Sequence, residues 1–158
     1  MIVTPVGQPE KRQPEVCNCL ALRQAARHVT QFYDRNLADT GLRTTQYSIL
    51  AKLSRVGPLT IGALAEAMVM DRTTLGRNIR PLERDGLIAI APGSKDKRSR
   101  ELSLTEAGSR RMAQARDAWA RSQERFEAVF GQGRTLDLRA LMRALTQSDF
   151  DAAGPSRG

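Results

Sequence analysis

Apolar side chains recur every three or four residues at both ends of the chain, which is the spacing of one helix face. This pattern predicts a helix over 16–37, a longer helix over 105–130 and a last helix after a Gly-Gln-Gly break at 131–133. The apolar positions of the first helix are Cys19, Leu22, Ala26, Val29 and Tyr33. Those of the long helix are Met112, Ala115, Trp119, Phe126, Val129 and Phe130. Those of the last helix are Leu136, Leu138, Leu141, Met142 and Leu145.

The middle of the chain is divided into shorter segments. Thr44 or Thr45 is the predicted N-cap of a helix that lies between Gly41 and Gly57. Its apolar positions are Tyr47, Ile49, Leu50 and Leu53. This helix leads into the most informative part of the sequence.

Two short capped helices follow, separated by three or four residues. Thr60 is the predicted cap of a helix over 61–68, and Asp71 caps a second helix that Gly86 ends. Pro81 lacks the N–H that a helix needs and predicts a kink or an early loosening of the second helix. The inward positions are Ile61, Leu64, Ala65 and Met68, and then Leu75, Ile79 and Leu82. This arrangement is typical of a helix-turn-helix.

A β-hairpin is predicted directly after the two helices. Residues 87–90 and 101–104 have the character of short strands, and a charged turn over 94–100 joins them. The fold class predicted by the whole pattern is mainly α with a small β-hairpin wing, that is, a winged helix-turn-helix with further helices at both ends.

The outward face of the second short helix carries the residue types that bind DNA in the major groove. Arg binds guanine with two hydrogen bonds, Asn suits adenine, and Thr offers a methyl group to thymine or a hydroxyl to phosphate. The helix N-terminus also directs free N–H groups at phosphate. The alternative is a solvated helix side, which the neighbouring capped helix and basic hairpin disfavour. The predicted contacts of this motif are Thr60, Arg72, Thr73, Thr74, Arg77, Asn78 and Arg80.

The hairpin turn predicts a second DNA contact. Arg98 is placed to enter the adjacent minor groove, where the potential is most negative in narrow A·T tracts. Asp96 is expected to hold the Arg98 guanidinium in a bidentate ion pair. The alternative is an exposed turn with a weak surface ion pair. The other cations of the turn are Lys95, Lys97 and Arg100.

The composition agrees with DNA as the partner. The net charge is +8, which favours an anionic partner, and two of the four lysines lie in the hairpin turn. We predict no enzymatic activity, cofactor or metal, because the chain has one histidine, two cysteines and no Gly-rich phosphate loop. No apolar run of about 18 residues suggests a membrane span, so we expect a cytoplasmic protein.

Two motifs resemble those of the MarR (multiple antibiotic resistance regulator) family. The first is Asp71-Arg72-Thr73-Thr74-Leu75 followed by Leu82-Glu83-Arg84-Asp85-Gly86-Leu87-Ile88, which resembles the family's recognition helix. The second is Asp96-Lys97-Arg98 followed by Leu104-Thr105-Glu106-Ala107-Gly108, which resembles its wing and the start of its fifth helix. The resemblance covers about 17–145. It implies a homodimeric transcriptional regulator, on our reading a repressor, that binds a pseudo-palindromic operator on double-stranded DNA.

The resemblance also implies a division of the chain. Residues 41–104 form the expected DNA-binding lobe, and 15–40 with 105–148 form the dimerisation helices. The apolar stripes at both ends agree with dimerisation, since a monomer could hardly cover them. The ends, 1–14 and 149–158, are rich in proline or in small polar residues and are expected to be a flexible arm and tail.

Two mechanisms of signal sensing remain open. In one, a small aromatic or carboxylated effector binds between the two regions and releases the DNA. The candidate lining residues are Arg23, Arg27, His28, Tyr33, Tyr47 and Trp119, although each also suits a structural role.

In the other mechanism, Cys19 is oxidised. The hydroperoxide-sensing branch of the family resembles this chain at Cys19, Arg27 and Tyr33, but a further tyrosine of that branch is Thr44 here. Cys19 also suits a small buried apolar residue, and Cys17 lies off its helix face.

Two other classes of protein compete with the regulator. An enzyme would need a catalytic group, and His28 in a helix is more often a plain surface or interface residue. A winged helix that binds only protein would be favoured by a neutral wing, whereas this wing is basic. A gel-shift assay with the gene's own upstream DNA separates both from a DNA-binding regulator.

Overall fold

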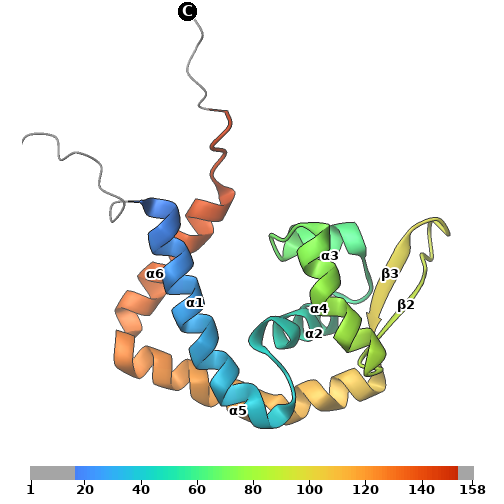
Figure 1. Cartoon of the computed structure of the whole chain (residues 1–158), viewed down its shortest axis with the longest axis horizontal. Helices are drawn as coiled ribbons and strands as arrows, with labels where there is room; N and C mark the ends of the chain where they lie inside the picture. Colours follow the sequence, from blue (N-terminus) through green and yellow to red (C-terminus); the bar gives the residue numbers. More distant parts are fainter. Residues whose placement is uncertain (1–16, 153–158) are drawn as a thin grey trace, which may run out of the picture. The chain divides into compact units, whose positions relative to one another are not determined.

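The computed structural model describes residues 17–152 (Figure 1). The chain divides into two compact units, Met1–Trp119 and Ala120–Gly158, and the boundary falls within helix α5 (Glu106–Phe130). No helix in the described range is long and apolar enough to cross a membrane. The predicted arm over 1–14 lies outside the described residues, as does the end of the predicted tail.

The predicted order of elements is confirmed, with one short strand added. Before α5 the chain forms α1 (Asn18–Leu37), η2 (Ala38–Thr40), α2 (Thr44–Val56), β1 (Leu59–Thr60), α3 (Ile61–Ala67), α4 (Arg72–Arg84), β2 (Ile88–Pro92) and β3 (Arg100–Leu104). After α5 it forms α6 (Gln132–Gln147). The mainly helical fold with a small sheet is the predicted fold class.

The sheet has three antiparallel strands in the order β1-β3-β2. Leu102 of β3 is the central residue, opposite Leu59 of β1 and Ile90 of β2. Strand β1 was not predicted, because two residues before a helix cap show no alternating pattern. It joins the start of α3 to the middle of β3.

One continuous core holds the first unit together. The inward residues predicted for α2 and α4 lie in it, as do Leu64 and Ala65 of α3, while Ile61 and Met68 are partly buried against it. Leu102 and Met112 join this core from β3 and α5. Burying a leucine or isoleucine side chain contributes about 1.5–3 kcal/mol. The buried apolar residues are Leu37, Leu42, Tyr47, Ile49, Leu50, Leu53, Leu64, Ala65, Leu75, Ile79, Leu82, Leu87, Ile88, Leu102, Met112, Ala115 and Ala118.

The start of α2 differs from the prediction. Thr44 is the first helical residue and Arg43 is the N-cap, so neither Thr44 nor Thr45 caps the helix. The Asp34 carboxylate of α1 accepts the Thr44 N–H at 2.7 Å, and the Gln46 side chain accepts the Arg43 N–H at 2.9 Å. A carboxylate ten residues away thus replaces the local cap and ties α1 to α2.

The expected early loosening of α4 at Pro81 is wrong, because the helix continues to Arg84. Proline removes one N–H donor, and the remaining bonds of the last turn are present. The Asp85 N–H donates to the Pro81 carbonyl at 3.0 Å, and the Leu87 N–H donates to the Leu82 carbonyl at 2.8 Å. The chain then leaves the helix through Gly86, whose φ of 71° favours glycine.

The second unit is a helical corner. Only Gly131, with φ of 100°, separates α5 from α6, so the predicted three-residue break is too long. The Arg134 guanidinium lies 4.4 Å from the centre of the Phe130 ring, and Arg139 pairs with Glu127 at 2.9 Å. Most of the apolar face predicted for α6 stays exposed within this chain.

Candidate nucleic-acid interface

Helices α3 and α4 are each fixed by the predicted cap. The Thr60 hydroxyl accepts the Ala63 N–H at 3.1 Å, and the Asp71 carboxylate accepts the Thr74 N–H at 2.8 Å. Between the helices, Val69 has a left-handed φ of 52° and an exposed side chain. A β-branched residue is strained in this conformation. The turn sets the angle at which α4 leaves α3.

The Asp71 carboxylate also binds the Thr74 hydroxyl, at 2.6 Å. This hydrogen bond and the one from the Thr74 N–H lower the pKa of Asp71 below its ordinary value. The carboxylate therefore stays ionised at the N-terminus of α4, where the helix dipole favours negative charge. An ionised cap keeps the first turn of α4 formed before any ligand binds.

The predicted contact face of α4 lies on the surface. Arg72, Thr73, Thr74, Arg77 and Arg80 are exposed. Two polar side chains of this face form hydrogen bonds within the helix or with its cap. The Thr74 hydroxyl donates to Asp71, and the amide of Asn78, which is half-buried, donates to the Thr74 carbonyl at 2.9 Å. The arginines are thus the main hydrogen-bond donors that this face offers to a ligand.

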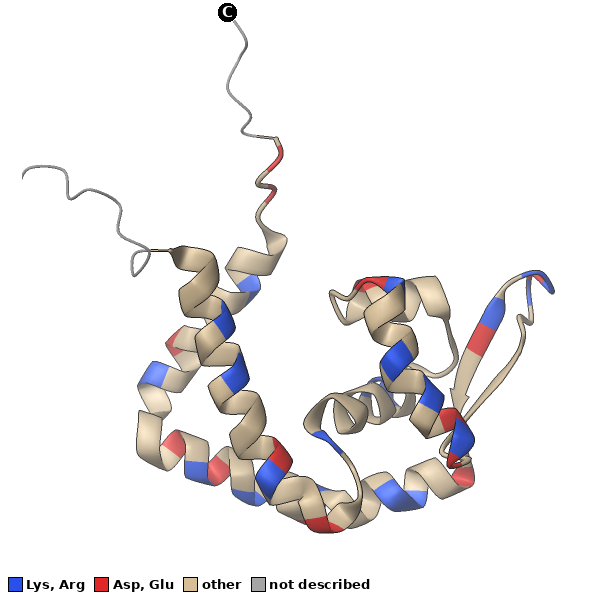
Figure 2. Cartoon of the chain, viewed as in Figure 1, with Lys and Arg blue, Asp and Glu red and all other residues tan. Residues whose placement is uncertain are grey.

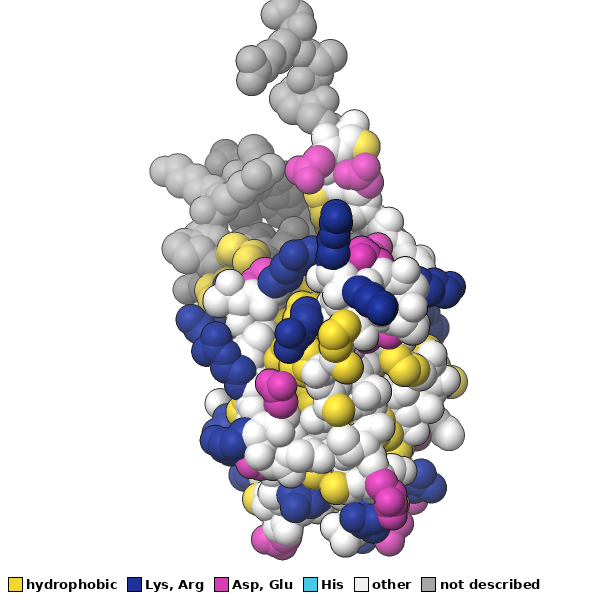
Figure 3. Space-filling model, turned by 90° about the vertical axis from the view of Figure 1, so that its right-hand side faces the viewer, with side chains coloured by type: hydrophobic (Ala, Val, Ile, Leu, Met, Phe, Trp, Pro, Cys, Tyr) yellow, Lys and Arg dark blue, Asp and Glu magenta, His cyan; other side chains and the backbone are white. Residues whose placement is uncertain are grey.

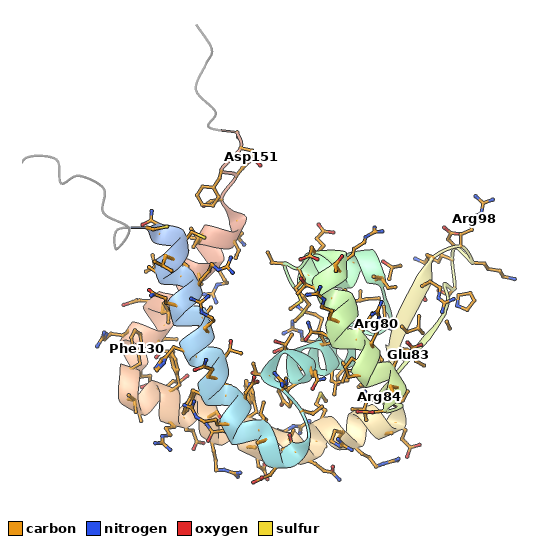
Figure 4. All side chains as sticks on the ribbon, in the orientation of Figure 1. Arg80, Glu83, Arg84, Arg98, Phe130 and Asp151 are labelled. Carbon is orange, nitrogen blue, oxygen red and sulfur yellow. The ribbon has the colours of Figure 1, made fainter. Side chains whose placement is uncertain are left out.

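The C-terminal end of α4 carries a different set of charges. Figure 4 labels Arg80, Glu83 and Arg84 on this half of the helix. Arg84 pairs with Asp85 at 3.0 Å, and this contact raises the pKa of Arg84 above its ordinary value. Because Arg84 is engaged by its neighbour, the arginines of α4 that form no ion pair with a described residue are Arg72, Arg77 and Arg80.

The tip of the hairpin has a defined conformation. The Gly93 N–H donates to the Ser99 carbonyl at 2.9 Å, and the Ser99 hydroxyl donates to the Asp96 carbonyl at 2.7 Å. A Cβ atom at Gly93 would lie 2.2 Å from the Ser99 hydroxyl oxygen and 2.6 Å from the Asp96 carbonyl oxygen. Only glycine fits this position, which gives the wing a fixed shape.

The expected ion pair between Asp96 and Arg98 is wrong. The Asp96 carboxylate accepts the backbone N–H of Arg98 at 2.9 Å, and no ion pair of Arg98 occurs among the described residues. A side chain two residues back is well placed for its own turn and poorly placed for the end of a long arginine. The Arg98 side chain extends away from the hairpin (Figure 4).

The charges follow the two elements that the sequence singled out. Lys and Arg segments run along α4 and reappear at the hairpin tip between β2 and β3 (Figure 2). Four cations lie at or beside the tip, and all are exposed: Lys95, Lys97, Arg98 and Arg100. On the face seen in Figure 3, basic side chains are scattered among acidic, hydrophobic and neutral ones. This surface offers apolar contacts as well as charge.

Helix α5 begins against the end of α4. The Thr105 hydroxyl donates to the Gly86 carbonyl at 2.7 Å and accepts the Gly108 N–H at 3.0 Å. A Cβ atom at Gly108 would lie 2.0 Å from the Leu87 carbonyl oxygen. This close approach fixes the start of α5 to the loop after the candidate recognition helix.

The predicted effector residues do not all gather in one place. Arg23, Arg27 and His28 are exposed along α1, and Tyr33 is half-buried. Tyr47 and Trp119 stack, with ring centres 5.8 Å apart, and line a pocket of about 220 Å³. The other lining residues are Ser48, Ala51, Lys52 and Arg55. Sequence reasoning missed Lys52 and Arg55, although both lie on the α2 face that carries Ser48.

The core of the chain itself does not bury Cys19, so the interpretation of Cys19 as a small buried apolar residue stays a prediction that depends on a partner subunit. Both Cys19 and Cys17 are exposed free thiols. Cys17 is the N-cap of α1, and its sulfur accepts the Leu20 N–H at 3.4 Å. Only Leu37 of α1 is fully buried, so the predicted apolar stripe of this helix meets no core of its own chain near Cys19.

Comparison with known proteins gives a consistent result. The model of the MarR family matches residues 42–99, which span α2 to the wing. The transcriptional activatory protein BadR of Rhodopseudomonas palustris is 31% identical over 124 residues, which cover 75% of this chain and 67% of that protein. The organic hydroperoxide resistance transcriptional regulator of Bacillus subtilis is 31% identical over 90 residues, covering 57% of this chain and 61% of that protein.

A solved structure is also similar to most of this chain. The regulator MosR of M. tuberculosis in complex with DNA is 35% identical, with a TM-score of 0.71. The match covers 82% of this chain and 96% of that one. The motifs of α4 and the wing, the winged-helix fold and these relatives show that the chain belongs to the MarR family of DNA-binding transcriptional regulators and is not an enzyme.

Proposed function

We propose that two copies of this chain bind a pseudo-palindromic operator and that a small molecule controls the binding. In this proposal the N-terminal half of α4 enters the major groove and the hairpin tip contacts the adjacent minor groove. The observation that carries it is the joint exposure of Arg72, Arg77 and Arg80 on a capped helix beside a basic, rigid wing.

Each contact has a distinct role in this proposal. Arg77 lies in the middle of the exposed face and suits a guanine, with which arginine forms two hydrogen bonds. Arg72 lies against α3, since its guanidinium is 3.4 Å from where a Cβ of Gly62 would lie. Together with Thr60 it is placed to bind phosphate. Arg98 is expected to recognise the width of the minor groove more than the identity of its bases.

A homodimer is supported by apolar side chains that the chain leaves exposed on its terminal helices. Leu20 and Leu22 of α1 are each 38% exposed, and Leu136 and Leu141 of α6 are 58% and 64% exposed. Exposed leucines on both terminal helices are typical of an interface between identical subunits. The predicted division into a DNA-binding lobe and dimerisation helices is part of this proposal.

The test is binding to the DNA upstream of the gene. Sedimentation of the complex should give two chains per operator, and footprinting should give two protected half-sites centred about 10 base pairs apart or a multiple of that spacing. Arg77→Ala should weaken the operator more than unrelated DNA. A complex with one chain, or equal affinity for any sequence, would contradict the proposal. Repression stays a prediction, because the relative from R. palustris is named as an activatory protein. A reporter assay tests the direction of regulation.

Oxidation of Cys19 is the second candidate for the signal. It is favoured by the exposure of the thiol and by the similarity to the organic hydroperoxide resistance regulator of B. subtilis. A sulfenic acid at Cys19 would place a polar group beside the proposed interface. Cys19→Ser should then keep operator binding and resist release by hydroperoxide, whereas Cys17→Ser should respond as wild type. Equal release of all three proteins would exclude Cys19 as the sensor.

A further inference from the structure

Val69, in the turn between α3 and α4, is a valine in a left-handed backbone conformation. Its φ is 52°, and no other residue apart from glycines has a positive φ within the described range. Branching at Cβ makes this conformation unfavourable for valine, whereas glycine adopts it without strain. Valine at this position therefore makes the folded protein less stable than glycine would.

The backbone of the turn is held in this conformation by hydrogen bonds on both sides of the Val69 Cα atom. The Val69 N–H donates to the Glu66 carbonyl at 3.0 Å, and the Met70 N–H donates to the Ala65 carbonyl at 2.9 Å. The cap of α4 at Asp71 follows directly. Because the turn connects two capped helices, the strain at Val69 is not relieved by a local change of conformation.

The side chain of Val69 adds little to the core. Its neighbours Met68 and Met70 are partly buried against the core, whereas Val69 is 73% exposed. Among the described residues of the first unit, no other large apolar side chain is as exposed. A single exposed valine is ordinary on a protein surface, but an exposed valine in a strained conformation points to a function outside the fold.

The turn lies at the end of α4 that faces DNA in the proposed function. Recognition helices contact base edges with their N-terminal residues, and Val69 precedes Arg72, the first residue of α4, by three positions. Figure 1 shows the start of α4 and the hairpin tip on the same side of the winged-helix part. The exposed side chains at the start of α4 are Arg72, Thr73 and Thr74, so Val69 adds an apolar side chain to a polar surface.

Thymine is the base that offers an apolar group to such a side chain. Of the four bases, it alone carries a methyl group at its major-groove edge. The valine side chain has no hydrogen-bonding atom, so it distinguishes bases by apolar contact alone. We infer that Val69 contacts the methyl group of a thymine next to the bases that α4 contacts, and that it thereby helps to determine the operator sequence. The inference rests on the proposed docking of α4 in the major groove.

The test uses operators that differ by one methyl group. An operator is selected from random duplexes with the full-length wild-type protein, and each thymine of one half-site is then replaced in turn by deoxyuridine, which lacks the methyl group. At the thymine that Val69 contacts, wild type should bind the deoxyuridine duplex about threefold to fivefold more weakly, which is the effect of exposing one buried methyl group. Val69→Gly should bind the two duplexes equally.

A matched pair of alanine variants locates the contact. Val69→Ala should reduce the ratio of thymine to deoxyuridine affinity at the same position. Val129→Ala is the control, because Val129 is 81% exposed and lies in the second unit; it should keep the wild-type ratio at every position. If both Val69 variants keep the wild-type ratio at every thymine, the inference is overturned and the proposed function stands. If wild type selects no sequence at all, the proposed function fails, and this inference fails with it.

Thermal unfolding tests the strain at Val69 without DNA. Val69→Gly should unfold at a higher temperature than wild type, since glycine removes the strain and little core packing is lost. The same variant should bind the selected operator more weakly, because the contact with the methyl group is gone. A lower unfolding temperature for Val69→Gly would show that valine stabilises the turn, and would overturn the inference that it is there for DNA.

Discussion

The winged-helix part of the chain and its terminal helices differ in how deeply their apolar side chains are buried within the chain. The core residues all lie between Leu37 and Ala118, and nine of them are leucines with exposed fractions of at most 3%. By contrast, α1 contributes only Leu37 to this core, and Leu141 in α6 is 64% exposed. The same residue type thus stabilises the fold in one region and remains available for a partner in the other. In our proposal that partner is a second copy of the chain.

The largest expected effect comes from the same substitution in both regions. Leu75→Ala leaves a cavity in a closed core and should lower the free energy of unfolding by about 2–5 kcal/mol. Leu141→Ala should have a smaller effect that grows as the protein is diluted, because it weakens association. Urea denaturation at several protein concentrations measures both. Equal effects that do not depend on concentration would remove the contrast.

Two glycines give a second matched pair. Gly108→Ala places a Cβ 2.0 Å from the Leu87 carbonyl oxygen, and overpacking of this kind costs about 1–3 kcal/mol. Gly133→Ala in α6 meets nothing within 4 Å and should stabilise the protein by about 0.5–1 kcal/mol, since alanine loses less entropy in a helix. Thermal unfolding of both variants measures the difference. Stabilisation by Gly108→Ala would show that α5 does not start tightly against the Leu87 backbone.

The smallest of these effects concerns the cap of α4. The pKa of Asp71 is lowered in the folded protein, so its contribution to stability is present above the ordinary pKa of aspartate and is lost as the pH falls through the lowered value. Asp71→Ala should therefore destabilise the protein at neutral pH and lose this disadvantage in acid. Unfolding measured across this pH range tests the sign. A deficit that increases on acidification would contradict it.

The sequence predicted the elements whose signals are local. Caps at Thr60 and Asp71 and the apolar positions of α2 to α4 were correct because each depends on neighbours a few residues away. The role of Asp34 at the start of α2 and the pairing of β1 with β3 were missed, since both depend on contacts between distant residues.

In the candidate site, too, features that depend on local sequence were predicted and those that depend on three-dimensional contacts were not. The exposed face of α4 and the basic hairpin tip lie where the helical period and the turn placed them. The Asp96 to Arg98 ion pair was wrong, because the carboxylate is used by the turn itself. The pocket beside Trp119 needed the packing of α2 on α5, which no pattern along the chain contains.

The salt dependence of operator binding tests the central claim most directly. If α4 and the wing bind DNA as a dimer that neutralises about 6–10 phosphates, the affinity should fall roughly a thousandfold or more between about 50 and 200 mM salt. Arg98→Ala should reduce the slope by about one for each phosphate that is no longer neutralised, while the matched variant Arg143→Ala on α6 should keep the wild-type slope. An affinity that is insensitive to salt, or equal slopes for both variants, would contradict the account.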